Sequence, residues 1–133
     1  MRAATVVVLA ALSCAGPSAP TLVTFDPQPT LTVSTSQGRA LSVFEQVGAP
    51  VARGVNAVRL AFGPEVPVDQ VRLAVTPWMP VMGHGSAVTP TVELVDGGFD
   101  VTEVSLAMPG KWELRSHFEG ALSDDAVISF DVP

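Results

Sequence analysis

The sequence predicts an all-β protein, and two observations support this fold class. Among its 133 residues are 11 glycines and 12 prolines, while only 15% of the residues are charged. A Val-rich chain with so many turn-forming residues is typical of short strands joined by turns. Apolar residues also recur with a period of two, as in Val58, Leu60 and Phe62. This period indicates antiparallel strands with one buried face.

The strands can be placed in order along the chain. The alternation indicates strands around positions 56–62, 71–76, 111–118 and 126–132. Between two further apolar runs, Asp96-Gly97-Gly98 predicts a hairpin turn, because glycine reaches the positive φ angles that such turns need. After Val101 the apolar positions change parity, which predicts a β-bulge near Thr102-Glu103.

About seven short strands at a spacing of roughly 8–12 residues fit an immunoglobulin-like antiparallel β-sandwich. We expect Trp112 to fill the centre of its core. Asp124 and Asp125 lie at a predicted turn, and we interpret both as solvated charges. The predicted sandwich domain spans residues 38–133.

Residues 1–13 have the composition of a secretory signal peptide, with one arginine, a short apolar run and small residues at the end. Cys14 follows Ala11-Leu12-Ser13, a sequence that resembles a bacterial lipobox. This resemblance implies cleavage before Cys14 and lipidation of its thiol, whereas the alternative is a secreted protein that loses Cys14 with its leader. Residues 14–37, rich in Pro, Ser and Thr, are expected to form a tether, although positions 30–34 could already form an edge strand.

The leader therefore predicts a periplasmic protein of the bacterial cell envelope, in contact with the membrane through a lipid anchor only. The formal net charge of −6 and a single lysine, Lys111, argue against nucleic acid as a partner. One cysteine allows neither an intramolecular disulfide nor a Cys-based zinc cluster. The sequence contains no Gly-x-Ser-x-Gly elbow, P-loop or paired-carboxylate pattern, so we do not expect an enzyme.

The segment from Pro77 to Gly85 gathers Met79, Met82 and His84 within six residues. Thioethers bind Cu(I) well and hard cations poorly, and imidazole adds a stronger ligand. The segment therefore predicts a copper site, with Cu(I) as the favoured state. The alternative is that the methionines fill gaps in the core and the histidine is solvated.

Met108 is a fourth candidate ligand. In an up-and-down strand order, connections separated by one hairpin emerge at the same end of a sandwich. One hairpin separates the 77–90 segment from the 107–110 connection, so we expect Met108 beside the Met79–His84 loop. His117 lies further along the next strand, and we interpret it as a solvated residue at the far end.

Three motifs between Trp78 and Leu114 resemble YtkA-like domains: Trp-Met-Pro-x-Met-Gly-His-Gly, Gly-Gly-Phe-Asp-Val and Met-Pro-Gly-Lys-Trp-Glu-Leu. These domains are related to the FixH proteins of cytochrome oxidase assembly. The resemblance implies an immunoglobulin-like sandwich in the bacterial envelope with a role in copper handling. It also implies that four residues fall on the family's Met/His positions, namely Met79, Met82, His84 and Met108.

Two functions follow from these expectations. The first is an extracytoplasmic copper-binding protein, a Cu(I) chaperone or scavenger, with a protein partner in envelope copper handling or oxidase assembly. The second is a metal-free interaction module in which Trp78, between Pro77 and Pro80, is a rigid aromatic anchor on the interaction surface. A copper-dependent rise in melting temperature would distinguish the two.

Overall fold

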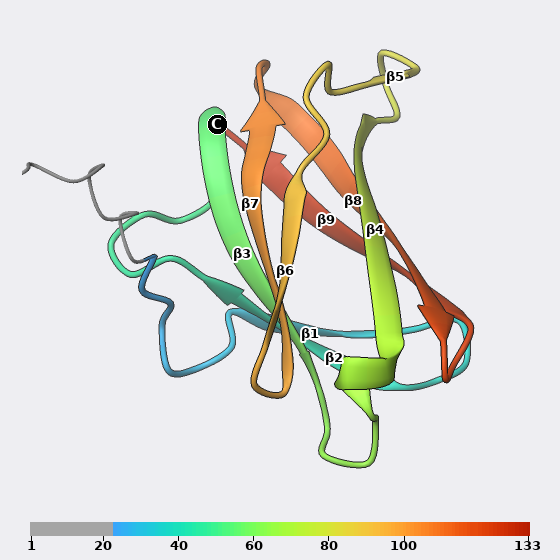
Figure 1. Ribbon diagram of the computed structural model, residues 1–133. Helices are drawn as coiled ribbons and strands as arrows, with labels where there is room; N and C mark the ends of the chain where they lie inside the picture. The colour runs from blue at the N-terminus through green and yellow to red at the C-terminus, as the bar shows by residue number, and fades with distance from the viewer. Residues whose placement is uncertain (1–22) are drawn as a thin grey trace, which may run out of the picture.

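The computed structural model describes residues 23–133, which form two antiparallel β-sheets packed face to face (Figure 1). The strands are β1 (Leu31–Ser34), β2 (Ala40–Glu45), β3 (Gly54–Phe62), β4 (Val71–Met79), β5 (His84–Gly85), β6 (Thr91–Val95), β7 (Gly98–Leu106), β8 (Gly110–Gly120) and β9 (Asp124–Val132). A 3-10 turn, η1 (Val68–Gln70), precedes β4. Within residues 23–133, no helix is long and apolar enough to cross a membrane. The predicted all-β sandwich is confirmed.

The strand order explains why the sequence predicts about seven strands while the described chain has nine. One sheet has the order β1-β2-β3-β7-β6 and the other has the order β5-β4-β8-β9. The strands β2-β3-β7-β6 and β4-β8-β9 reproduce the four-plus-three arrangement of an immunoglobulin constant-type sandwich. The two additional strands, β1 and β5, each extend an edge of one sheet and are only four and two residues long.

The predicted hairpin and bulge are both present. A two-residue turn joins β6 to β7, and Gly97 within it has a φ of 78°. Asn56 of β3 pairs with Val104 of β7, whereas Val58 pairs with Val101, so β7 carries one extra residue between these pairs. Glu103, inside this bulge, has a φ of 57° and is the only non-glycine residue of the described part with a positive φ. The bulge lets both halves of β7 present apolar side chains to the core.

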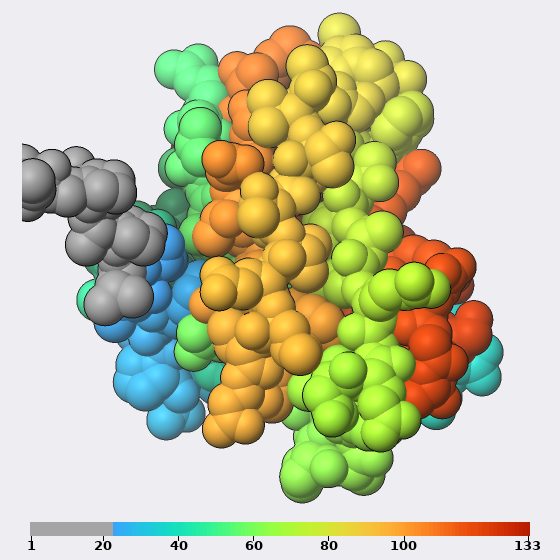
Figure 2. Space-filling view, viewed as in Figure 1, coloured from blue at the N-terminus to red at the C-terminus, as the bar shows by residue number. Residues whose placement is uncertain are grey.

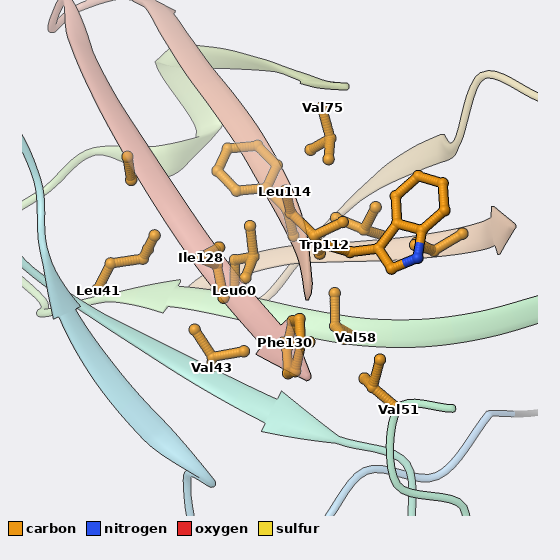
Figure 3. Close-up of a cluster of buried hydrophobic side chains, with 14 of the residues drawn as sticks. Leu41, Val43, Val51, Val58, Leu60, Val75, Trp112, Leu114, Ile128 and Phe130 are labelled. Atoms are coloured by element: carbon orange, nitrogen blue, oxygen red, sulfur yellow. The ribbon is translucent and has the colours of Figure 1, made fainter. Parts of the chain in front are cut away.

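The core lies between the two sheets. Figure 3 shows Trp112, Leu114 and Ile128 of one sheet facing Val58 and Leu60 of the other. Trp112 is 1% exposed and fills the centre as expected. Buried and exposed residues alternate without interruption along β9, as the two-residue period predicts.

The sandwich begins N-terminal of position 38, where the sequence placed its boundary. β1 forms the edge strand considered for positions 30–34 and pairs with β2. Phe25 is only 8% exposed, and the guanidinium carbon of Arg59 lies 4.7 Å from the centre of its ring. Backbone pairing and burial therefore hold part of the expected tether against the domain. The expected leader, 1–13, and Cys14 lie outside the described residues.

Asp124 corrects one expectation, because it is 2% exposed and not solvated. Its carboxylate accepts hydrogen bonds from the Thr35 hydroxyl, from the backbone N–H groups of Gln37 and Asp125, and from Arg39 Nη1 at 3.1 Å. Burial raises the pKa of Asp124, but these hydrogen bonds outweigh it and hold the pKa below its ordinary value. Asp124 thus joins the β1–β2 turn to the start of β9.

Candidate metal centre

The four candidate ligands all lie at one end of the sandwich, which we call the Met end. Figure 1 shows β5 and the connection from β7 to β8 both at the top of the molecule. Figure 2 shows the 80–90 loop and this connection side by side on the surface. The expectation that one hairpin returns the chain to the same end is therefore correct.

A tight turn positions the first three candidates. The carbonyl oxygen of Met79 accepts hydrogen bonds from the N–H groups of Met82, at 3.2 Å, and Gly83, at 3.0 Å. Gly83 has a φ of 64°, in the region that favours glycine. The turn pairs Met79 with His84 across β4 and β5, so these two side chains leave the sheet on the same face.

Met79, Met82 and Met108 line one cavity of about 290 Å³. Met79 is 4% exposed and belongs to the core, whereas Met82 is 56% exposed. Met108 is half-buried and packs against the core. A Cβ atom at Gly110 would lie 2.8 Å from Cε of Met79, so the end of this methionine packs closely against the Gly110 backbone. Three methionines, from the end of β4, the turn after it and the β7–β8 connection, therefore line the same space.

His84 lies on a neighbouring cavity of about 300 Å³, which Met108 also lines. The imidazole is exposed, and its Nδ1 donates a hydrogen bond to the carbonyl oxygen of Gly85 at 3.2 Å. A backbone acceptor on one ring nitrogen fixes the tautomer that leaves the other nitrogen free for a metal. Trp112 lines the same cavity, and its Nε1 donates a hydrogen bond to the Met108 carbonyl oxygen at 2.9 Å. This bond anchors the connection that carries Met108.

The Met end carries little formal charge. Between Arg72 and Glu93 the sequence has no Asp, Glu, Lys or Arg, and Lys111 is the only charged residue lining the three-methionine cavity. In residues 23–133, no three His, Cys, Asp or Glu side chains lie together as a metal-binding group. Any metal site at this end therefore depends on thioethers, which suit soft, low-charge ions and not Mg²⁺ or Ca²⁺.

Trp78 and His117 lie on the outer face of the β5-β4-β8-β9 sheet. The Trp78 ring is half-buried, and the guanidinium carbon of Arg115 lies 4.8 Å from its centre. His117 lies toward the far end of the sheet, as expected, where it pairs with Ala74. It is ion-paired, because its Nδ1 donates to Asp125 at 2.6 Å and its Nε2 donates to Glu119 at 2.9 Å. Both ring nitrogens are engaged, so His117 offers no free donor to a metal.

Sequence reasoning missed several residues that shape the Met end. Val81, Pro109, Gly110 and Lys111 line the three-methionine cavity but carry no metal-ligand signature. The last three directly follow Met108 in the Met-Pro-Gly-Lys motif. This adjacency in sequence was the signal that could have identified them as part of the cavity.

No family model matches this chain, and neither a curated protein nor a solved structure matches it.

Proposed function

We propose that this chain is an extracytoplasmic copper-binding protein that takes up Cu(I) at its Met end and passes it on or sequesters it. The observation that carries the proposal is the cavity that Met79, Met82 and Met108 line together. These residues come from the end of β4, the turn after it and the β7–β8 connection. Their meeting at one cavity gives a soft ion several donors on a rigid scaffold.

The donor chemistry favours Cu(I). Thioethers are neutral and polarisable, so they bind a soft monovalent ion without needing to lose a proton. No carboxylate lines the cavity, and the one charged residue there, Lys111, is a cation. A divalent hard ion would meet no compensating negative charge, which gives Cu(I) an electrostatic advantage as well.

The proposal includes the compartment and the family. The apolar leader and Cys14 support secretion with lipid anchoring, and the motif resemblance supports a YtkA-like domain. Both fit a function in which copper is handled outside the cytoplasm. Copper is the cargo of such a protein, and a second envelope protein is the expected donor or acceptor.

One observation also favours the second candidate, a metal-free interaction module. Val81 is 85% exposed, Met82 is 56% exposed and Val88 is 44% exposed, all in the loop at the Met end. Exposed apolar side chains clustered in this way are typical of docking surfaces. Trp78 supports docking less, because Arg115 already stacks on its ring.

Thermal unfolding with and without Cu(I) tests the proposal. The experiment uses a Cys14→Ser chain under anaerobic conditions, because the cysteine thiol would itself bind Cu(I). At about 100 times Kd, Cu(I) should raise the melting temperature by roughly 10 °C, by mass action. Met82→Leu should reduce this shift, whereas Val81→Ala, which removes no donor from the same rim, should keep it. An unchanged melting temperature with Cu(I) would favour the interaction module.

A further inference from the structure

The candidate ligands are divided between two neighbouring cavities. One cavity is lined by Met79, Met82 and Met108, and the other by His84 and Met108. Met79 and His84 are paired across β4 and β5, yet they line different spaces. Met108 is the only residue common to both linings.

The two cavities differ in how exposed their donor side chains are. In the first, Met79 is a core residue at 4% exposure and Met82 lies at the rim at 56% exposure. An ion held there has an interior donor beneath it and a surface donor above it. In the second, the exposed His84 ring and the 86–88 segment form the surface side. Trp112, 1% exposed, lines the inner side of this cavity. An ion held there has an exposed imidazole as a ligand, which an approaching molecule can reach.

Met108 can place its sulfur in either cavity. Its backbone is anchored, because its carbonyl oxygen accepts the hydrogen bond from Trp112 Nε1. Its side chain has three rotatable bonds and a polarisable sulfur, so it can turn while the backbone stays in place. His84, in turn, has Nδ1 engaged by the Gly85 carbonyl oxygen, which leaves Nε2 to face an ion.

We infer that Cu(I) occupies two positions that share the Met108 thioether: an inner position with Met79 and Met82, and an outer position with His84. This inference rests on the proposed copper function and goes beyond it, because it assigns the ligands to two sets and gives each a role. The inner position holds the ion at equilibrium. The outer position is the one from which the ion is exchanged with other molecules.

The two sets predict different effects for their ligands. Removing Met82 weakens the inner position, so Cu(I) moves to the outer one and imidazole becomes a ligand. Removing His84 leaves the inner position intact, so affinity is kept but exchange slows. Removing Met108 damages both positions.

The test uses X-ray absorption at the copper edge and the rate of Cu(I) release to bathocuproine disulfonate, on Cys14→Ser chains loaded anaerobically with one equivalent of Cu(I). The parent chain should show sulfur scattering with little imidazole contribution. Met82→Leu should show fewer sulfur ligands and a clear imidazole contribution. His84→Ala should keep the parent affinity and release Cu(I) about tenfold more slowly, which corresponds to a barrier to release about 1.4 kcal/mol higher. His117→Gln, at the other histidine, should match the parent chain in both measurements.

Two results would overturn the inference while leaving the copper function intact. One is a parent chain with a full imidazole ligand in addition to its sulfur ligands, which would mean a single four-donor site. The other is a His84→Ala chain that loses as much affinity as Met82→Leu. A Cys14→Ser chain that takes up no Cu(I) would overturn both the inference and the proposed function.

Discussion

Replacing Asp124 with asparagine removes a negative charge from a buried position while nearly keeping the side-chain volume. The two carboxylate oxygens of Asp124 accept four hydrogen bonds, two at each oxygen. An asparagine has one acceptor oxygen, so its NH₂ group would face two donors that are left without a partner. Bonds to a charged acceptor contribute about 1.5–3 kcal/mol each.

The contribution of Arg39 is discounted, because its side chain is 38% exposed and solvent screens the pair. We therefore expect Asp124→Asn to lower the free energy of unfolding by about 2–3 kcal/mol at neutral pH. The measurement is urea unfolding followed by tryptophan fluorescence. Asp131→Asn, an exposed aspartate on the same strand, should change the free energy by less than about 0.5 kcal/mol.

The pH dependence of the stability difference between the parent and Asp124→Asn chains tests whether the Asp124 charge is responsible. The pKa of Asp124 is lowered from its ordinary value of 3.8, mainly because the hydrogen bonds from Thr35 and the backbone outweigh the cost of burial. Its stabilising contribution is therefore full above pH 3.8 and is lost as the pH falls through the lowered pKa. The difference between parent and Asp124→Asn chains should shrink in acid. A difference that stays constant from about pH 5 to pH 2 would refute the reasoning.

Three further predictions concern the outer face and the Met end. Hydrogen bonds to the Asp125 and Glu119 carboxylates raise the pKa of His117 above 6.5, so an NMR titration of His117 should give a midpoint above that value. The stabilisation that these hydrogen bonds give the folded state should disappear as the pH rises through the midpoint. Gly110→Ala should lower the free energy of unfolding by about 1–3 kcal/mol, because Gly110 has a φ of 126° and a Cβ would meet Met79. Trp112→Phe should cost about 1–3 kcal/mol, because it leaves the Met108 carbonyl oxygen without its donor, and it should weaken Cu(I) binding.

Matched variants separate these effects from general destabilisation. A Cβ atom at Gly48 would meet nothing within 4 Å, and the φ of Gly48 is 69°, so Gly48→Ala should lower the free energy of unfolding less than Gly110→Ala in the same urea unfolding experiment. Ile128→Val removes buried volume away from the Met end and should lower stability while preserving Cu(I) affinity. A His117 midpoint at or below 6.5, or a Trp112→Phe chain with parent affinity, would contradict the corresponding prediction.

Most of the fold could be predicted from the sequence because strand parity is a direct physical signal. The change of parity after Val101 located the β7 bulge, since an extra residue must shift every later side chain to the other face. The same parity places Asp124 among the inward positions of β9. Its charge and turn context favoured solvation instead, whereas the β1–β2 turn supplies three of the four donors that stabilise it inside.

The site was predictable in part. Topology alone brought Met108 to the same end as Met79, because β6 leads the chain away from that end and β7, after the hairpin turn, leads it back. The division of His84 and Met79 between two cavities was not predictable, since it depends on the direction in which the turn through Gly83 leaves β4. The stacking of Arg115 on Trp78 also escaped prediction, because it depends on the register of β4 against β8.

Native mass spectrometry after anaerobic Cu(I) titration tests the central claim most directly. The Cys14→Ser chain should gain one copper ion, and Zn²⁺ under the same conditions should not add. A chain in which Met79, Met82 and Met108 are all replaced by leucine should gain none. Equal copper uptake by the parent and the triple variant, or uptake of Zn²⁺ in place of Cu(I), would contradict the account.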